Sequence, residues 1–139
     1  MKNFNISGFV TSIETKYNHL NIMFLSDYEK LDNYKFSKQD FDKDLLLKKL
    51  NEQEEYFSEN NIDDIKSPIS KCKKYFKTKY SKYCKCYNME KTPIDINEII
   101  GHKVKMFVKL KPYNFQDFKT KKKIVGTSIL LEKIFIVEM

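Results

Sequence analysis

H-K-V-K-M-F-V-K-L-K, residues His102–Lys111, carries the most regular strand pattern in the chain. Apolar and basic side chains alternate along it one by one, which is the period of a β-strand with one buried face and one solvent face. The apolar face consists of Val104, Met106, Val108 and Leu110. The opposite face consists of Lys103, Lys105, Phe107, Lys109 and Lys111. Pro112 lacks an amide donor and is expected to end the strand.

Further strands are expected on both sides of this segment. Toward the N-terminus, Phe4–Thr15 and His19–Ser26 are separated by a short polar turn, which predicts a β-hairpin. Gly8 lies inside the first of these strands, where a glycine often marks a bend or a bulge. Toward the C-terminus, Ile124–Val137 is expected to be one long apolar strand, or two short strands broken near Glu132.

The segment Ser70–Asn88 fits two structures. As a strand, it places lysines and tyrosines on one face and mostly apolar residues and cysteines on the other. As a helix, it brings Phe76, Tyr80 and Tyr83 to the same side, because they recur every three or four residues. The strand is favoured, since aromatic residues and cysteines suit a pleated surface.

One helix is expected at Phe41–Phe57, where leucines and glutamates recur at helical spacing and the outer face is acidic. The polar segments on either side, Asp27–Gln39 and Ser58–Pro68, are expected to be loops. A short helical turn is expected at Ile94–Ile100, ending at Gly101.

Positive charge is concentrated in two parts of the chain. The sequence has 26 basic residues, all of them lysine, against 19 acidic ones, a net charge of +7. Residues 66–88 and 101–123 are rich in lysine and contain one acid between them, Asp117, whereas residues 27–65 are predominantly acidic. A fold that joins the two basic segments would present one strongly positive face. Because arginine is absent, bidentate readout of guanine by arginine is excluded, and lysine acts mainly as a point charge on phosphate.

Aromatic side chains lie among these lysines at positions expected to face solvent. Phe107 is the sharpest example, because it shares the lysine face of a strand whose other face is wholly apolar. Single-stranded nucleic acid would give such a ring a partner, since bases stack on aromatic rings while lysines neutralise phosphates. The alternative is that a helix or a second sheet covers Phe107.

Two further groups repeat this pattern of aromatic and basic residues. The expected loop at Tyr113–Lys123 contributes Tyr113, Phe115, Phe118, Lys119, Lys121, Lys122 and Lys123. The expected outer face of the Ser70–Asn88 segment contributes Lys73, Tyr75, Lys77, Lys79, Tyr83, Lys85 and Tyr87. Each group also has a purely structural interpretation, either as a loop held down by its own aromatics or as a solvated basic surface.

The sequence gives little support to metal binding or catalysis. Cys72, Cys84 and Cys86 lack the C-x2-C knuckle typical of tetrahedral zinc, so buried thiols are favoured over a metal site, with His19 or His102 as the fourth ligand if zinc binds. Neither a glycine-rich phosphate loop nor a nucleophile motif occurs, and the acids cluster around the expected helix. We therefore expect neither enzymatic activity nor a cofactor.

The N-terminal residues give no sign of export. Met1–Val10 lacks the apolar core of a signal peptide, and no apolar run approaches the ~20 residues that span a bilayer. An odd number of cysteines also argues against a secreted disulfide framework. A cytoplasmic protein, or a viral protein acting in the host cell, is expected, without a membrane partner.

Two segments resemble those of a known family. Ile96–Tyr113, I-N-E-I-I-G-H-K-V-K-M-F-V-K-L-K-P-Y, resembles the V-x-V-x-V strand of OB-fold single-stranded DNA-binding proteins. Ile6–Ile13, I-S-G-F-V-T-S-I, resembles the glycine-containing first strand of such barrels. The lysine-rich, arginine-free chain is also similar to small replication proteins of A/T-rich viruses and cytoplasmic linear plasmids. The resemblance implies sequence-tolerant protection of single strands during replication.

The order of the expected elements fits a mainly β, α+β domain built on an OB-like five-stranded Greek-key barrel. One domain is expected to span residues 1–139. The acidic segment at about 27–65 departs from a minimal barrel and is expected to be a helical insertion or a contact surface for replication proteins. The predicted function is single-stranded DNA binding through lysine–phosphate contacts and base stacking.

Two alternatives stay open. The chain could be a protein–protein interaction or assembly module, whose basic face meets an acidic partner or its own acidic helix in a homo-oligomer. It could also be an RNA-binding OB module, because backbone contacts and stacking do not separate the two sugars without a contact to the 2′-hydroxyl.

Overall fold

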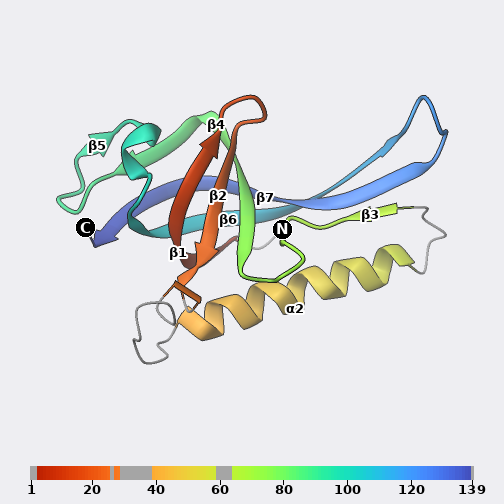
Figure 1. Ribbon diagram of the computed structural model, residues 1–139, viewed down its shortest axis with the longest axis horizontal. Coiled ribbons are helices and arrows are strands. Elements are labelled where there is room, and N and C mark those ends of the chain that lie inside the picture. Colours follow the sequence, from red (N-terminus) through yellow and green to blue (C-terminus); the bar gives the residue numbers. More distant parts are fainter. Residues whose placement is uncertain (1–2, 26, 29–38, 59–63, 139) are drawn as a thin grey trace.

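The computed structural model describes residues 3–25, 27–28, 39–58 and 64–138. Its elements are, in chain order, β1 (Asn3–Glu14), β2 (His19–Phe24), α2 (Gln39–Ser58), β3 (Asp64–Lys66), β4 (Tyr75–Tyr87), β5 (Pro93–Ile94), the 3-10 helix η1 (Ile96–Ile99), β6 (Lys103–Gln116) and β7 (Lys123–Glu138). The long strands curl around one another, α2 lies along one side of them, and the β6–β7 hairpin extends beyond the other barrel strands, alongside α2 and β3 (Figure 1).

Five strands close into a barrel in the order β1-β2-β4-β7-β6, with β6 returning to β1. The neighbouring pairs are antiparallel, apart from the parallel pairing of β4 with β7 that completes the circuit. The predicted fold class, a mainly β, α+β fold with an OB-like five-stranded barrel, is confirmed. The strand interpretation of the Ser70–Asn88 segment is confirmed as well, since β4 is a strand of 13 residues.

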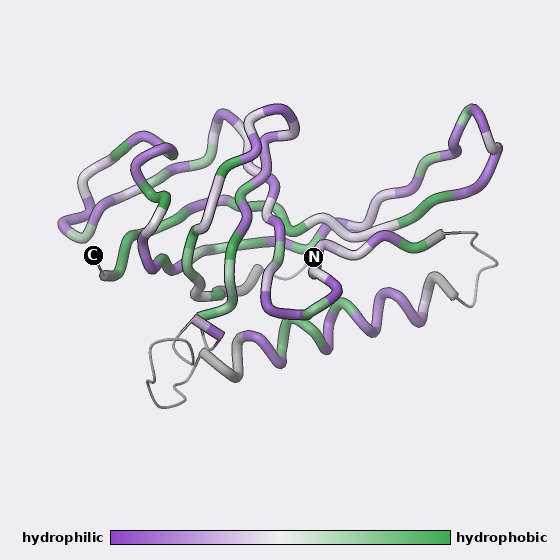
Figure 2. Tube along the Cα trace, in the orientation of Figure 1, coloured by the Kyte–Doolittle hydropathy of each residue, from purple (hydrophilic) through white to green (hydrophobic). Residues whose placement is uncertain are grey.

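The barrel interior is filled by alternate residues of each strand. Val104, Met106 and Val108 of β6 are completely buried, whereas Lys105 between them is exposed. The same alternation shows as interleaved purple and green along the strands (Figure 2). The facing strands add Ile6, Val10, Leu20, Ile22, Phe24, Phe76, Ile129 and Ile134 to the core. Burial of this apolar surface is the main force that closes the sheet.

β1 contains both a close approach and a bulge. A Cβ atom on Gly8 would overlap a methyl group of Ile22, so a residue without a side chain is needed where β1 crosses β2. The register of β1 against β2 then shifts between Val10 and Ser12. The extra residue reverses the alternation, and Ile13 packs against the core where a regular strand would have turned it to solvent.

β6 does not end at Pro112, as predicted from the sequence, but continues to pair with β7 as far as Gln116. β1 accompanies β6 only to Lys109, so within the described chain the other edge of β6 has no partner strand further on. A residue without an amide donor is tolerated at such an edge. Tyr113 and Phe115 are therefore strand residues and not loop residues, and the connecting turn lies at 117–122.

β7 is a single strand whose register against β6 shifts at two places, one near its end and one in its middle. Phe107 pairs with Lys133 and Val108 pairs with Leu131, so Glu132 is an extra residue on the β7 side. The expected choice between one long strand and two short ones is thus resolved as one strand with a β-bulge at the suspected position.

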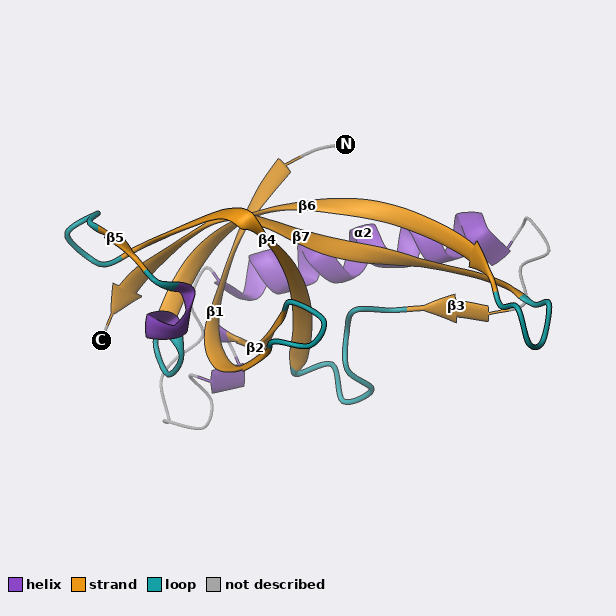
Figure 3. Cartoon of the chain, turned by 90° about the horizontal axis from the view of Figure 1, so that it is seen from above, coloured by secondary structure: helices purple, strands orange, loops and turns teal. Residues whose placement is uncertain are grey.

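α2 lies beneath the barrel and the extended hairpin (Figures 1 and 3). Leu46 and Leu50, one helical turn apart, are buried in the core. Farther along the helix, the Thr127 hydroxyl donates a hydrogen bond to the side-chain oxygen of Gln53, which ties α2 to β7. Of the two segments expected as loops, Ser58–Pro68 contains β3, which pairs in parallel with β7. Residues 29–38 of the other segment lie outside the described residues.

The chain before and after β4 is made of tight turns. Residues 70–74 turn into the strand, so Cys72 is exposed, although a strand beginning at Ser70 would have placed it on the apolar face. After β4, the Asp95 carboxylate accepts a hydrogen bond from the Asn97 amide at the start of η1. The expected helical turn at Ile94–Ile100 is shorter than predicted, since Ile94 belongs to β5 and η1 ends at Ile99. Gly101 follows two residues later, and its φ of 82° favours glycine.

Candidate nucleic-acid interface

The two aromatic and basic segments of the sequence meet on one side of the barrel, because β7 lies between β4 and β6. Along this side Lys85 is paired with Lys133, and Lys133 with Phe107. One step along, Tyr87 is paired with Phe135, and Phe135 with Lys105. We call the outward side chains of these three strands the basic face: Lys79, Tyr83, Lys85, Tyr87, Lys105, Phe107, Lys109, Lys111, Leu130, Lys133 and Phe135.

Three rings form a cluster on the basic face. Tyr87 and Phe135 are stacked, with ring centroids 4.9 Å apart and an interplanar angle of 14°. Phe107 meets Phe135 edge to face at 5.8 Å and 73°. The Lys105 ammonium lies 5.9 Å from the centroid of Phe107. The cluster therefore combines flat apolar rings with a cation, which is the composition of a stacking platform for bases.

The environment of Phe107 falls between the two interpretations offered by the sequence. The ring is half-buried, and its contacts are with Phe135 and Lys105 of the same outer surface. It also lines an open hollow of about 510 Å³. Phe107 thus lies outside the barrel core and still presents part of its ring to solvent.

A second hollow, of about 450 Å³, lies farther along the basic face. It forms where β4 leaves β7 between Tyr80 and Lys85 and carries Tyr83 outward, with 76% of that residue exposed. Lys109 and Lys133 line its other side together with Glu132, whose carboxylate forms a 2.8 Å ion pair with Lys109. The exposed ring beside the Lys133 ammonium group is again suited to a base and a phosphate.

Beyond the barrel, the hairpin of residues 112–126, here called the arm, continues the same surface. The rings of Tyr113 and Phe115 stack at 6.3 Å with an interplanar angle of 12°. Gly126 lies directly opposite Tyr113, and a Cβ atom there would overlap the tyrosine ring. At the tip Phe118 is 98% exposed. Four lysines follow it in the sequence and are exposed too: Lys119, Lys121, Lys122 and Lys123.

A shallow hollow of about 140 Å³ joins the arm to β4. Tyr113 lines one side, and His19, Lys77 and Lys79 line the other. OB-fold barrels bind oligonucleotides over their second and third strands and the loops 1–2 and 4–5, which here are β2, β4 and the turns at 15–18 and 117–122. Burial, followed by the nearby Lys77 charge, lowers the pKa of His19.

Four of the sequence-predicted site residues are placed differently from the others. Tyr75 begins β4 and pairs with Met23 of β2, away from β7, and Lys73 lies in the turn before it. Lys103 lies 5.5 Å from the Tyr28 ring, at the side of β1. Lys77 forms a 3.5 Å ion pair with Glu14 beside the arm. The structure thus brings most of the predicted lysines and aromatics together but separates this group from the three-ring cluster.

The sequence did not single out several residues of the same surface. Phe135 is the most important, since it links Tyr87 to Phe107. A signal for it existed, because Ile134 and Ile136 are buried on either side and alternation then turns Phe135 outward. Lys133 was not selected because it lies within the same apolar strand, away from the two lysine-rich segments. Met89 and Lys91 follow β4 in a turn that has no strand pattern.

The cysteines occupy three environments. Cys86 is buried, Cys84 is half-buried and Cys72 is exposed. Within the described residues no group of three or more histidine, cysteine, aspartate or glutamate side chains could hold a metal ion. The neighbouring Cys86 thiol and burial raise the pKa of Cys84. A hydrogen bond with the Ser70 hydroxyl, 3.3 Å from the sulfur, lowers the pKa of Cys72.

We expect Cys72 to be the fast-reacting thiol of the native protein. Its lowered pKa increases the thiolate fraction at a given pH, so its alkylation should begin at a lower pH than that of free cysteine. Maleimide labelling at pH 7 should show one fast equivalent, and this equivalent should disappear in Cys72→Ser. A fast phase that persists in the variant would contradict the assignment, and denaturant should expose all three thiols in the original chain.

No helix among the described residues is both long enough and apolar enough to cross a membrane.

No protein-family model and no curated protein matches the chain. Solved structures with the same fold include the single-stranded DNA-binding protein from bacteriophage Enc34, with a TM-score of 0.53 at 13% identity over 99% of this chain and 81% of the phage protein. They also include gp2.5, a single-stranded DNA-binding protein encoded by bacteriophage T7, with a TM-score of 0.50 at 14% identity over 100% of this chain and 93% of gp2.5. At such identities the likeness is one of fold, so the chain shares the OB-like barrel of these two phage proteins.

Proposed function

We propose that this protein binds single-stranded DNA with little sequence preference and without catalysing a reaction. The observation that carries the proposal is the joining of the three-ring cluster, the lysines of the basic face and the arm into one continuous surface. The fold is shared with two phage proteins that are named for the same activity, which supports the proposal further.

The mechanism has two parts that respond differently to salt. Lysines of the basic face and the arm neutralise phosphates and release counterions, so affinity falls as the salt concentration rises. Bases stack on Phe107, Phe135, Tyr113, Phe115 and Phe118 at roughly 1–3 kcal/mol per base, and this gain depends little on salt or on base identity. Lysine offers no bidentate pairing with guanine, which fits a binder of many sequences.

The remaining predictions extend this proposal. We assign the protein to DNA replication, in a virus or a plasmid with an A/T-rich genome, acting inside the host cell. The whole chain would be one domain, in which the segment at about 27–65 is an insertion between two barrel strands. The acidic residues of that segment would contact replication proteins or a second copy of the chain.

The direct test is fluorescence anisotropy with labelled oligonucleotides at several salt concentrations. We expect nanomolar-to-micromolar affinity for single-stranded DNA, a steep dependence on salt, and weaker binding of duplex. RNA with the same base sequence serves as the third ligand, because the amino-acid sequence is also compatible with an RNA-binding module. Equal affinity for single and double strands would defeat the proposal. Absent binding, together with a protein partner that survives nuclease treatment, would favour the interaction module.

Phe107→Ala should weaken binding of single-stranded DNA by roughly 1–3 kcal/mol and leave the slope of affinity against salt almost unchanged, because stacking releases no counterions. The free energy of unfolding should fall by less than the roughly 3–5 kcal/mol of a core phenylalanine, since the ring is half-buried and lies outside the core. Thermal melts and salt titrations give both quantities. A large loss of stability with unchanged affinity of the folded fraction would assign Phe107 to the core instead.

A further inference from the structure

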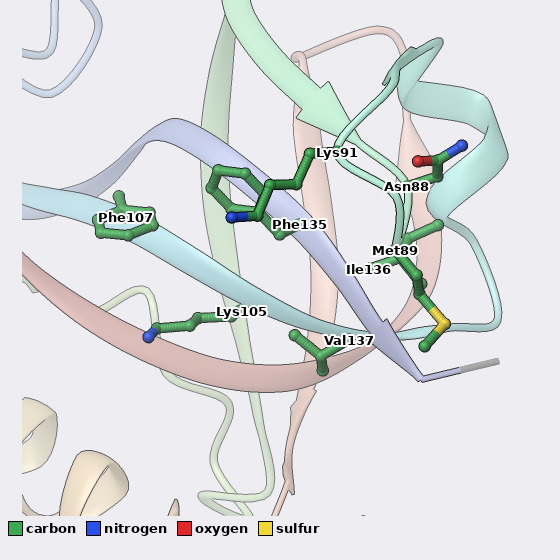
Figure 4. A pocket seen from close by; sticks show the side chains of 8 residues that line it. All are labelled: Asn88, Met89, Lys91, Lys105, Phe107, Phe135, Ile136 and Val137. Atoms are coloured by element: carbon green, nitrogen blue, oxygen red, sulfur yellow. The ribbon is translucent and has the colours of Figure 1, made fainter.

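The hollow beside Phe107 lies at the end of the basic face opposite the arm. Its walls are mainly apolar: the rings of Phe107 and Phe135 face Met89 and Val137 across an opening of about 510 Å³ (Figure 4). Met89 and Val137 are 52% and 44% exposed, so this apolar lining is open to solvent. The volume falls in the range of sites that take small molecules or single nucleotides.

Two lysines border this apolar opening. Lys105 lies on β6 and Lys91 in the turn after β4, and neither forms an ion pair within the described part of the chain. Figure 4 shows Lys91 and Lys105 among the side chains that line the hollow, together with Phe107 and Phe135. A purely apolar partner would gain nothing from two ammonium groups at the rim, whereas a nucleotide offers a flat base and anionic phosphates together.

The turn that carries Met89 and Lys91 is held by its own hydrogen bonds. The Asn88 side-chain oxygen accepts the backbone amides of Glu90 and Thr92, at 3.0 and 2.9 Å. The Lys91 amide donates to the Asn88 carbonyl at 3.0 Å, and Lys91 adopts a φ of 64°. A turn fixed in this way presents its side chains in a set position before any ligand arrives, which lowers the entropic cost of binding.

We infer that this hollow is a subsite for one unstacked nucleotide at one end of the bound strand. The base lies between Met89 and the Phe107–Phe135 pair, and its neighbouring phosphates contact Lys91 and Lys105. Along β6, Phe107 beside the hollow and Phe115 in the arm are eight residues apart, about 26 Å at ~3.3 Å per residue. The DNA site therefore runs from the arm to the hollow along the length of the basic face. This inference rests on the proposed function.

The chain contains no tryptophan, so a single introduced tryptophan reports on its own position. Met89→Trp places the reporter in the hollow, and Phe118→Trp places it at the arm tip, each in an otherwise unchanged protein. The titrating ligand is an oligo(dT) long enough to span both positions. We expect it to quench the tryptophan fluorescence of both variants, with similar midpoints of the two titrations. Circular dichroism melts check that each variant is folded.

The outcomes separate the subsite from the function. Quenching at position 118 with unchanged emission at position 89, at saturating oligo(dT), would overturn the subsite and leave the proposed function standing. If oligo(dT) causes no quenching at either position and no change in anisotropy, both the subsite and the proposed function are overturned. Emission at position 89 that shifts with protein concentration before DNA is added would show a second copy in the hollow, which also overturns the subsite.

A matched pair of charge variants gives a second test without tryptophan. Val137→Glu places a carboxylate in the hollow, and Leu45→Glu makes the same change at an equally exposed position of α2. We expect Val137→Glu to weaken oligo(dT) binding about 5- to 150-fold, the range for losing one stacked base, and Leu45→Glu to have no effect. Equal affinities of the two folded variants would overturn the subsite.

Discussion

Replacing Lys119, Lys121 and Lys122 with glutamine is expected to weaken binding of single-stranded DNA, and more so at low salt. The ratio of the original affinity to that of the variant should be about 100-fold larger at 0.1 M salt than at 1 M salt. Each phosphate contact contributes roughly 0.7 to the slope of log affinity against log salt for single strands, so three contacts contribute about 2. All three lysines are exposed in the turn at the tip of the arm. Glutamine keeps an unbranched side chain at Lys121, whose φ is 58°.

The control removes the same charge elsewhere. Lys48 and Lys49 lie on α2, and Lys71 lies in the turn before β4, away from the basic face. Changing these three to glutamine alters the net charge equally and should leave the salt slope unchanged. Anisotropy titrations at four or more salt concentrations measure both slopes. If the two variants lose affinity in parallel, the arm has no special role and binding depends on overall charge alone.

Replacing Phe76 with alanine is expected to lower the free energy of unfolding by about 3–5 kcal/mol, the usual cost of removing a phenylalanine from a packed core. Phe76 is 1% exposed and packs against Phe24, with ring centroids 4.7 Å apart. Phe76 points into the barrel, whereas its neighbours on β4, Tyr75 and Lys77, are exposed.

Denaturant unfolding of Phe76→Ala beside Phe107→Ala compares an inner ring with an outer one. We expect the first to lose stability while its folded fraction keeps its affinity for DNA. The second should do the reverse. Similar losses of stability in both variants would show that inward and outward phenylalanines of the barrel strands contribute equally to folding, which would contradict the prediction.

The sequence by itself determined which face of each strand turns inward. This is a local property, because the backbone alternates its side chains with a period of two regardless of which strand lies alongside. Val104, Met106 and Val108 were therefore assigned to the core correctly, and Lys105 to the surface. The pattern failed where the period itself changes, at the β1 bulge near Val10 and at Glu132 of β7.

The limits of the strands were also decided by partners and not by local composition. A proline normally interrupts a sheet, but Pro112 lies beyond Lys109, the last residue of β6 that pairs with β1, and among the described strands only β7 accompanies β6 there. A local pattern cannot show how far a neighbour extends. The arm, with Tyr113 and Phe115 in strand conformation, therefore appeared in the sequence as a loop.

The candidate site depended most on the tertiary structure. The sequence found two basic and aromatic segments but could not tell whether they shared a surface. The parallel pairing of β4 with β7 places Tyr87 against Phe135, and the antiparallel pairing of β7 with β6 places Phe135 against Phe107. These rings come from three strands far apart in the chain. Only the closing of the barrel brings them together, because strand pairing over such separations is driven by burial of the whole core and leaves no periodic signal in any one segment.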